Sequence, residues 1–391
     1  MSDDTLVRVF PRTLDVKALA ARKSVFLFGP RSTGKTTLLR AQFDARAIVN
    51  LLRSSEYLPL AESPALLREI VAEGRVDAST DPPVVVIDEI QKLPALLDEV
   101  HDLIETQGIH FVLSGSSGRK LKRSGVNLLA GRAWQANLFP LTSAEIPEFN
   151  LGRYLLHGGL PQVYDSDYPE EELDSYVNTY LREEIRGEAL VQNFVHFARF
   201  LNVAAACNGQ QLNFANVSRD TGVPATSVRS YFDILADTFI GFLVQPWRGS
   251  RRKAVATAKF YFFDVGVANF LRGVGVLHRN SSEYGIAFEH FIAMELRSYV
   301  SYRRLRLELT YWRTQSGVEV DFLVGSAAIE VKASVRVSDR DLRGLRALAD
   351  EGSTAARFLV SFDELDRRTD DGIRLLHWRT FLTNLWTDAL F

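Results

Sequence analysis

A glycine-rich octapeptide near the start of the chain contains the residue types that a phosphate-binding loop needs. Residues 29–36 read Gly-Pro-Arg-Ser-Thr-Gly-Lys-Thr, which fits the pattern GxxxxGK[ST]. Glycines let backbone N–H groups wrap around phosphate oxygens, and the following helix start adds partial positive charge. We expect Lys35 to reach the β- and γ-phosphates of ATP and the Thr36 hydroxyl to ligate Mg²⁺. The predicted nucleotide-binding residues are Gly29, Pro30, Arg31, Ser32, Thr33, Gly34, Lys35, Thr36 and Thr37.

Two adjacent carboxylates, Asp88 and Glu89, follow the apolar run Val-Val-Val-Ile at 84–87. Ligands of open α/β sheets bind outside the carboxyl ends of the strands, so we expect both side chains beside the phosphate loop. Asp88 would hold the Mg²⁺ shell, directly or through water, and Glu89 would polarise the attacking water as general base. A nucleotide switch needs only the first carboxylate, so the pair favours ATP hydrolysis.

Two further positions could complete a hydrolytic site. The apolar run 110–113 ends in Ser-Gly-Ser-Ser, and we predict that Ser116 orients water beside the γ-phosphate, with Ser114 as the second choice. Arg132 could act as a finger on the ATP of a neighbouring subunit, where it would stabilise transition-state charge. A surface salt bridge is the alternative role for this arginine. The competing candidates for the finger are Arg119 and Arg123.

A second set of chemically capable residues lies towards the C-terminus. Two strand-like runs, 319–324 and 328–332, are joined by a short turn that contains a glycine. Because side chains alternate along a strand, a hairpin would bring Asp321 together with Glu330 and Lys332 on one face. Two carboxylates and an ammonium group can bind Mg²⁺ and stabilise the charge that develops on a scissile phosphate.

The D-x₈-E-x-K spacing of this hairpin resembles the PD-(D/E)xK nuclease family, notably its branch that resolves Holliday junctions. Enzymes of that branch carry a glutamate on the first helix, and Glu289 is its counterpart here. Val320 stands where the proline that names the motif would be. The resemblance implies a metal site of Glu289, Asp321 and Glu330, with Lys332 beside it. A retained fold without cutting, or plain cross-strand ion pairs, are the alternatives.

The phosphate loop and the acidic pair both follow short strand-like runs that alternate with helical stretches from about residue 24 to 145. These runs lie at 24–28, 47–50, 84–87 and 110–113. Fully apolar runs of this kind are typical of parallel strands that helices cover on both faces. The pattern predicts an α/β fold with a P-loop NTPase parallel sheet over residues 1–150.

From about residue 150 to 250 the strand-like runs disappear, and 151–255 is predicted to be helical with a winged helix-turn-helix. In the segment 212–235, Gly222 suits a tight turn and Pro224 starts the second helix. The predicted buried face of that helix is Val228, Tyr231, Phe232 and Leu235. The residues left exposed, where a DNA reader places its contacts, are Thr226, Ser227, Arg229 and Ser230.

Any contact with DNA must come from local basic patches, because 46 Lys and Arg against 48 Asp and Glu give a net charge of −2. The basic runs are 119–123 and 248–253, and the second would lie at the tip of a wing. The predicted DNA contacts are Thr226, Ser227, Arg229, Arg251, Arg252 and Lys253. Solvated surface, or a winged helix that only packs against the motor, are the alternatives.

Beyond residue 255, short strand-like runs return on either side of a helix that we expect at 285–300. This pattern predicts an α/β domain over 256–391 that is nuclease-like in fold. A chain of 391 residues is too long for one ordinary core.

No apolar run is long enough to cross a membrane, and the single Cys207 excludes an internal disulfide framework. We therefore expect a cytoplasmic protein without a membrane partner.

Taken together, these features resemble a bacterial and archaeal family of AAA-type ATPases with a C-terminal domain of unknown function. The resemblance covers nearly the whole chain. It rests on Gly29–Thr37, Ile87–Pro94, Ser114–Ser117, Gly131–Arg132, His157–Pro161, Lys259–Gly266 and Gly317–Lys332. It implies hydrolysis of ATP, with Mg²⁺, by a homo-oligomer such as a hexamer.

Three functions fit the sequence. The first is an ATP-driven motor or switch associated with branched or duplex DNA, which the basic runs and the hairpin favour. The second is a STAND-like ATPase switch in signalling or defence whose C-terminal half binds protein, which the near-neutral charge favours. The third is a metal-dependent DNA nuclease that ATP gates.

Overall fold

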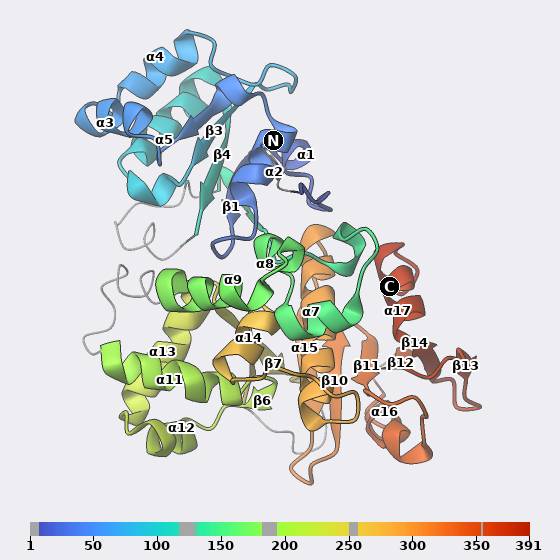
Figure 1. Cartoon of the computed structure of the whole chain (residues 1–391). Helices are drawn as coiled ribbons and strands as arrows, with labels where there is room; N and C mark the ends of the chain where they lie inside the picture. The colour runs from blue at the N-terminus through green and yellow to red at the C-terminus, as the bar shows by residue number, and fades with distance from the viewer. Residues whose placement is uncertain (1–7, 117–128, 130, 182–193, 250–256, 353–354) are drawn as a thin grey trace, which may run out of the picture. The chain divides into compact units, whose positions relative to one another are not determined.

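Two sheets organise the chain in the computed structural model (Figure 1), which describes residues 8–116, 129, 131–181, 194–249, 257–352 and 355–391. The chain divides into two units. The N-terminal unit comprises Met1–Leu141 with Asp237–Ile240, and the C-terminal unit comprises Thr142–Ala236 with Gly241–Phe391. The division into domains at 1–150, 151–255 and 256–391 stays a prediction.

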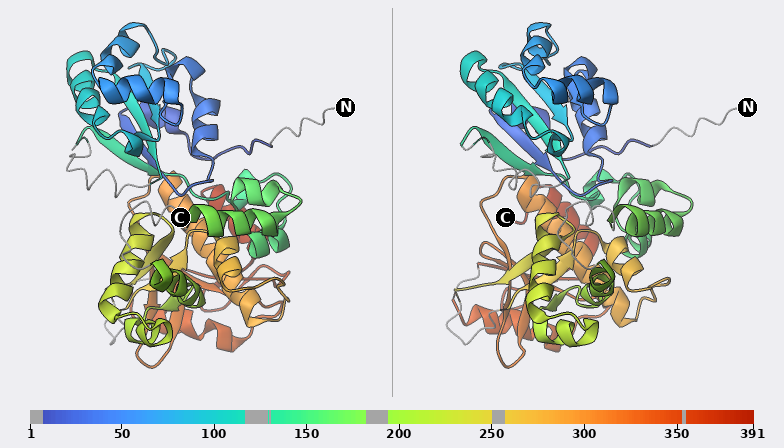
Figure 2. Two further views of the ribbon diagram at one scale, coloured as in Figure 1. Left: turned by 60° about the vertical axis from the view of Figure 1, so that its left-hand side comes forward. Right: turned by 90° about the vertical axis from the view of Figure 1, so that its left-hand side faces the viewer.

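The N-terminal unit is built on a parallel sheet, as the alternating runs predicted. Its five strands follow the order β2-β3-β4-β1-β5, and each neighbouring pair is parallel. The bounds are β1 Ser24–Phe28, β2 Ile48–Asn50, β3 Val84–Asp88, β4 His110–Gly115 and β5 Ala133–Asn137. Both β1 and β3 are buried along their whole length, because helices cover the two faces of the sheet (Figure 2).

Each face of this sheet packs against its own helices. The side chains of Phe26, Val85 and Phe111 form one core with the apolar residues of α3, α4 and α5. Alternation along the strands points Val25 and Val86 to the opposite face. The helices are α1 Val16–Ala20, α2 Lys35–Gln42, α3 Ser54–Glu62, α4 Leu66–Ala72 and α5 Leu96–Gln107, with 3₁₀ turns η1 Ala45–Ala47 and η2 Ile90–Lys92.

The strand order determines which side chains can meet. Because β4 lies between β1 and β3, the residues that follow these three strands share one edge of the sheet. The phosphate loop begins there at Gly29, the acidic pair lies at Asp88 and Glu89, and the serine-rich segment starts at Ser114. The sheet therefore positions the predicted hydrolytic residues, as open α/β sheets position their ligands.

A mixed sheet of nine strands forms the centre of the C-terminal unit, in the order β13-β14-β12-β11-β10-β9-β7-β8-β6. Strands β10 and β11 form the predicted hairpin, with Phe322 opposite Ile329. β10 carries a bulge against β9 between Val320 and Leu323. The bounds are β6 Gln210–Gln211, β7 Gly241–Pro246, β8 Lys259–Phe262, β9 Leu309–Arg313, β10 Glu319–Val324, β11 Ala327–Val331, β12 Ala356–Ser361, β13 Arg367–Arg368 and β14 Arg374–His377.

The predicted helix-turn-helix is present in this unit. Helices α12 (Phe214–Thr221) and α13 (Ala225–Asp237) flank Gly222, which has a φ of 70°. Together with α11 (Phe194–Ala206) they alternate with strands in the order α11-β6-α12-α13-β7-β8. β8 pairs with both β6 and β7, which is the topology of a winged helix.

The described strands of this winged helix belong to a larger sheet. β7 also pairs with β9, which places Gln245 beside Thr310 in a parallel ladder. The winged helix and the C-terminal strands therefore share one sheet. The sequence prediction of a helical region followed by an α/β region is confirmed, and the nuclease-like identity of the latter stays a prediction.

Helices cover both faces of the nine-stranded sheet. On one face Trp312, Leu323 and Leu345 belong to a buried cluster that α16 completes, whereas Phe358 meets Phe381 of α17 on the other. The helices of this unit beyond the winged helix are α7 Leu151–His157, α8 Pro161–Asp165, α9 Pro169–Ser175, α14 Val265–Leu271, α15 Ser282–Tyr302, α16 Arg343–Ala349 and α17 Trp378–Trp386, with η3 Ser143–Glu145, the π-helical η4 Tyr176–Leu181 and η5 Asp339–Leu342. Within the described ranges, no helix has the length and apolarity that crossing a membrane requires.

A buried carboxylate explains two glycine-containing segments of the C-terminal unit. Asp264 is only 1% exposed and caps α14 by accepting from the Val267 N–H at 3.0 Å. It also accepts from the Gly159 N–H at 2.8 Å, which ties the turn between α7 and α8 to α14. Burial raises the pKa of Asp264 to about 6, although these backbone N–H groups oppose the shift. A side chain at Gly158 would overlap this carboxylate, with its Cβ 2.0 Å from Asp264 Oδ1.

We expect Gly158→Ala to destabilise the protein by roughly 2–4 kcal/mol, because the new methyl group overlaps Asp264. In addition, φ 82° with ψ −170° is a backbone conformation that essentially only glycine adopts. Gly273→Ala is the control for a positive φ, since Gly273 has a φ of 71° and a Cβ added there would meet no atom within 4 Å. It should cost about 1 kcal/mol from backbone strain alone. Denaturant unfolding of both variants measures the difference, and equal losses would contradict the proposed overlap.

Candidate functional site

The phosphate loop lies between β1 and α2, in the strand–loop–helix context that its sequence predicted. Gly34 precedes the helix in a left-handed conformation, with φ 90° and ψ 24°, which glycine adopts without strain. Lys35, Thr36 and Thr37 form the first turn of α2. Because Gly34 has no side chain, it cannot cap the backbone N–H groups at this helix start, which suits the binding of an anion there.

In this structure the loop is closed by its own lysine. The Lys35 ammonium donates to the Gly29 and Pro30 carbonyl oxygens, each at 2.8 Å, and the residue is only 5% exposed. The Thr33 hydroxyl also donates to Pro30 O, at 2.9 Å.

Arg12 holds the loop from outside, and the sequence pattern did not identify it. Its guanidinium donates to Thr33 O and to Phe139 O, each at 2.6 Å. The contact joins the phosphate loop to the segment after β5. No motif marks Arg12, because its role depends on a contact between residues far apart in the chain.

The Asp88 carboxylate lies at the centre of the site and has no exposed surface. The Thr36 hydroxyl donates to its Oδ2 at 2.7 Å, and the Ser114 hydroxyl donates to Oδ1. The two residues predicted to hold Mg²⁺, Thr36 and Asp88, are therefore in direct contact. A hydroxyl and a carboxylate are the oxygen ligands that Mg²⁺ prefers, so the residues fit this ion.

Glu89 adopts a left-handed backbone, with φ 66°, directly before the 3₁₀ turn η2. The Gln91 amide donates to Glu89 Oε2 and, at 3.3 Å, to the Ser116 hydroxyl. Burial raises the pKa of Glu89 above its ordinary value, against the opposing positive charge of Lys35. The charges of Lys35 and Arg31, both in the phosphate loop, act on this carboxyl group and oppose the rise in its pKa.

The structure separates the two serine candidates. Ser114, the second choice, contacts Asp88, whereas Ser116, the first choice, contacts Gln91. The role of Ser116 in orienting water stays a prediction, and it would act through Gln91 and Glu89.

Of the three arginines that could act as a finger, the structure describes only Arg132. Arg132 forms an ion pair with Glu105 of α5 in the same chain, which is the alternative that the sequence left open. Its side chain is 37% exposed, so it remains accessible. The competing candidates Arg119 and Arg123 lie outside the described residues.

The second helix of the helix-turn-helix has the faces that its sequence predicted. Val228, Tyr231, Phe232 and Leu235 are buried, while Thr226, Arg229 and Ser230 are exposed and Ser227 is half-buried. The Arg229 guanidinium lies over the Phe214 ring, 4.8 Å from its centroid. The other predicted DNA contacts, Arg251, Arg252 and Lys253, lie outside the described residues.

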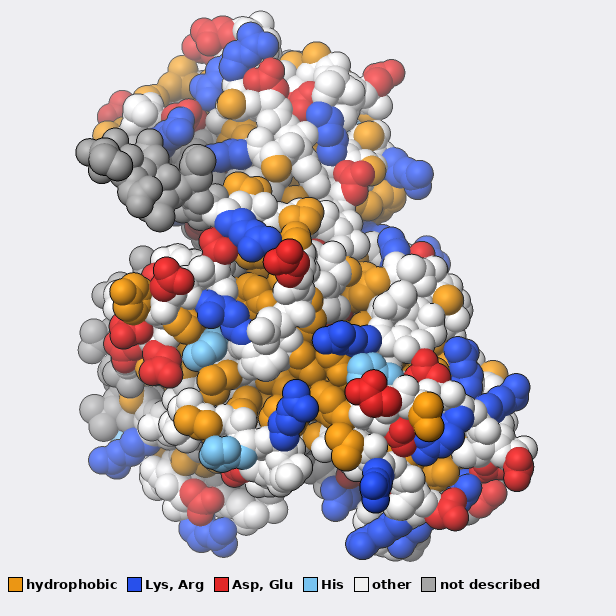
Figure 3. All heavy atoms as spheres, turned by 45° about the vertical axis from the view of Figure 1, so that its right-hand side comes forward, with side chains coloured by type: hydrophobic (Ala, Val, Ile, Leu, Met, Phe, Trp, Pro, Cys, Tyr) orange, Lys and Arg blue, Asp and Glu red, His pale blue; other side chains and the backbone are white. Residues whose placement is uncertain are grey.

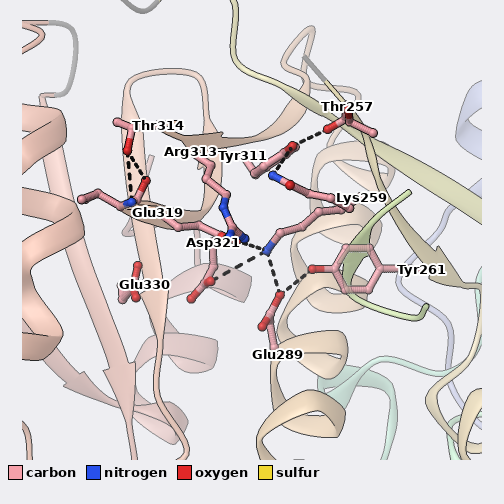
Figure 4. Close-up of polar contacts among 12 residues, drawn as sticks. Thr257, Lys259, Tyr261, Glu289, Tyr311, Arg313, Thr314, Glu319, Asp321 and Glu330 are labelled. Atoms are coloured by element: carbon pink, nitrogen blue, oxygen red, sulfur yellow. Dashed lines mark hydrogen bonds and ion pairs between the residues drawn. The ribbon is translucent and has the colours of Figure 1, made fainter. Parts of the chain in front are cut away.

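The C-terminal carboxylates surround a lysine that the sequence analysis did not assign to the site (Figure 4). The Lys259 ammonium of β8 is 3.2 Å from Glu289 Oε1 and 3.9 Å from Asp321 Oδ1, and it also contacts Glu319. The Tyr261 hydroxyl donates to Glu289 at 2.6 Å. Burial lowers the pKa of Lys259, but the surrounding carboxylates outweigh it and hold the pKa well above its usual value.

The remaining two members of the predicted metal site form a separate pair. Lys332 donates to Glu330 Oε1, and Glu330 is only 6% exposed. Burial and the neighbouring Asp321 raise the pKa of Glu330 well above its usual value. Across the described ranges, no group of three or more His, Cys, Asp and Glu side chains is arranged to hold a metal ion. The expected set of Glu289, Asp321 and Glu330 is therefore not assembled as a metal site.

Comparison with known families divides the chain into three segments. Residues 21–147 match the model of an AAA domain. Residues 148–277 match a domain of unknown function (DUF8612), and residues 284–381 match another (DUF4143). No curated protein matches the chain.

Two solved structures show distant similarity. The Orc1 protein of Aeropyrum pernix, in complex with DNA, is 14% identical, with a TM-score of 0.25 over 64% of this chain and 86% of that chain. A STAND protein with a tetratricopeptide repeat sensor from Pyrococcus horikoshii is 14% identical, with a TM-score of 0.24 over 76% of this chain and 47% of that chain. At these TM-scores neither structure supports an argument about role. Residues 21–147 are therefore similar to an AAA domain, and the other two matched segments are similar to domains of unknown function.

Proposed function

We propose that the protein binds ATP with Mg²⁺ at the phosphate loop and hydrolyses it to ADP and phosphate. The observation that supports this most directly is the contact of Thr36 with Asp88 at 2.7 Å, with Glu89 next in the chain. It joins the end of the phosphate loop to the acidic strand end. The predicted loop residues, Gly29 to Thr37, would surround the phosphates.

Each residue has a defined part in this proposal. Lys35 would leave its carbonyl partners and bind the β- and γ-phosphates, which costs little because an ionic partner replaces two neutral ones. Thr36 and Asp88 would hold Mg²⁺, which when bound neutralises charge on the phosphate oxygens. Glu89 would accept a proton from the attacking water. Its raised pKa favours that role, because a stronger base takes the proton more readily.

We also propose that the protein acts as a homo-oligomer in which Arg132 contacts the ATP of a neighbouring subunit. Arg132 would have to exchange Glu105 for phosphate oxygens. A half-exposed ion pair is worth little in water, so this exchange is energetically accessible.

Glu89→Gln tests the hydrolytic proposal. The amide cannot accept the proton, so we expect ATP turnover to fall by about 10²–10⁴-fold while ATP binding is retained. Glu73→Gln, which changes an exposed acid at the end of α4, should leave turnover unchanged. Phosphate release and nucleotide binding measure the two properties, and wild-type turnover by Glu89→Gln would overturn the assignment.

Gln91→Leu tests whether the amide positions Glu89. Its hydrogen bond lowers the pKa of Glu89, so its loss should raise that pKa and move the acid limb of the pH–rate profile upward by about one unit. At a given pH more Glu89 is then protonated, so kcat should fall while KM for ATP stays unchanged. Gln107→Leu, at the exposed end of α5, is the matched control. An unchanged acid limb in Gln91→Leu would argue that the amide has only a structural role.

For the biological role we propose a motor or switch associated with duplex or branched DNA. The winged-helix topology and the exposed Thr226 and Arg229 support it. The face in Figure 3 has Lys and Arg side chains interspersed with Asp and Glu. Because the net charge is −2, contact with DNA would depend on a local patch, for which we propose the exposed side of α13. The ATP-gated nuclease is not proposed, because the expected metal ligands are not assembled among the described residues.

Arg229→Ala tests this role. If α13 contacts DNA phosphates, affinity should fall roughly three- to tenfold and the salt slope should decrease by about one. Arg340→Ala, an exposed arginine of η5, should leave DNA binding unchanged. Binding of duplex and four-way DNA, and ATP turnover with each, provide the readout. A wild-type protein that ignores both DNAs would instead favour the signalling switch with a protein partner.

A further inference from the structure

The predicted metal site of the C-terminal unit already contains a cation, the ammonium group of Lys259. Two of the three expected metal ligands, Glu289 of α15 and Asp321 of β10, lie 3.2 Å and 3.9 Å from Lys259 Nζ. Glu319, which was not among the expected ligands, contacts the same nitrogen. Figure 4 shows the lysine reaching between these carboxylates from β8.

Each carboxylate of this cluster has a basic partner within the chain. Glu289 and Asp321 share Lys259, and Glu319 has both Lys259 and, at 2.8 Å, Arg313. Glu330 is paired with Lys332. A divalent cation would therefore have to compete with ammonium and guanidinium groups, which are held close by the same strands.

The oxygens of the cluster are also committed elsewhere. Asp321 Oδ2 accepts from the Val331 N–H at 2.8 Å, and Glu289 Oε1 accepts from the Tyr261 hydroxyl at 2.6 Å. Glu330 Oε2 is buried and has no hydrogen-bond partner among the described residues, but a single free oxygen is not a coordination sphere. Mg²⁺ requires near-octahedral oxygen ligands, which this donor set cannot supply while Lys259 Nζ lies between the carboxylates.

The lysine is held in place by its own surroundings. It is 3% exposed, and its ammonium lies over the Tyr311 ring at 5.4 Å from the centroid. Because β8 belongs to the winged helix while α15 and β10 belong to the C-terminal region, these ion pairs connect the two.

We propose that Lys259 replaces the divalent cation in this cluster, so that the wild-type C-terminal unit takes up neither Mg²⁺ nor Mn²⁺ here and does not cleave phosphodiesters. Removing the ammonium would then leave Glu289, Glu319 and Asp321 around an uncompensated position. That position would be a latent site for a divalent cation.

Mn²⁺ titration of the full-length protein without nucleotide tests this, with the free ion followed by electron paramagnetic resonance. Wild type and Asp321→Asn should bind Mn²⁺ equally. Lys259→Met should gain one Mn²⁺ site that is roughly tenfold or more tighter than any site in the wild type. The double variant Lys259→Met/Asp321→Asn should lose this site again, and Mn²⁺ should raise the Tm of Lys259→Met but not of wild type.

Two results would overturn the proposal. One is Mn²⁺ binding by wild type that Asp321→Asn abolishes, because the lysine would then not exclude the ion. The other is a folded Lys259→Met that gains no Mn²⁺ site. If Lys259→Met does not fold, Lys259→Arg is the second variant, because it keeps the positive charge. We expect Lys259→Arg to show no Mn²⁺ binding that depends on Asp321. Mn²⁺ binding by Lys259→Arg that Asp321→Asn abolishes would contradict the proposal.

Discussion

The buried Asp88 carboxylate is the constraint on which the N-terminal unit depends. A carboxylate without exposed surface is stable only if hydrogen-bond donors replace the water that it loses. Here the donors come from two other elements, Thr36 of α2 and Ser114 of β4. Both can reach Asp88 only because β4 separates β1 from β3. The strand order, the hydroxyl residues and the position of the phosphate loop together satisfy this one carboxylate.

The two carboxylate clusters of the chain satisfy their charges in different ways. Asp88 is held by neutral hydroxyl groups, which carry no positive charge to offset its own. Asp321 and Glu289 share an ammonium group, which offsets part of their negative charge. Similar acidic side chains therefore differ in chemistry because of the partner that the fold supplies.

The sequence predicted the parts whose signals are local. Fully apolar runs marked β1 to β4, and glycine with proline marked the helix-turn-helix. β5 was missed because Ala133–Asn137 is not an apolar run, although it completes the sheet beside β1. β6 was missed because it has only two residues.

The residues of the two sites were likewise predictable only where they form contiguous motifs. The phosphate loop and the acidic pair are contiguous motifs, so their pairing at one sheet edge followed from the fold class. The contacts of Arg12 and Lys259 join residues far apart in the chain, and no spacing rule reveals them. The same limit applies to the choice between Ser114 and Ser116, since it depends on which side chain faces Asp88.

The continuity of the nine-stranded sheet has a consequence for how the protein can be divided. β7 is the middle strand of the trio β8-β7-β9. A fragment beginning at residue 256 would keep β8 and β9 but remove the strand between them. Both would then have unpaired backbone groups along one edge, and such edges recruit strands from other chains and aggregate. A soluble C-terminal fragment must therefore include the winged helix. Helices α12 and α13 and the strands of the nine-stranded sheet cannot be separated into independent fragments.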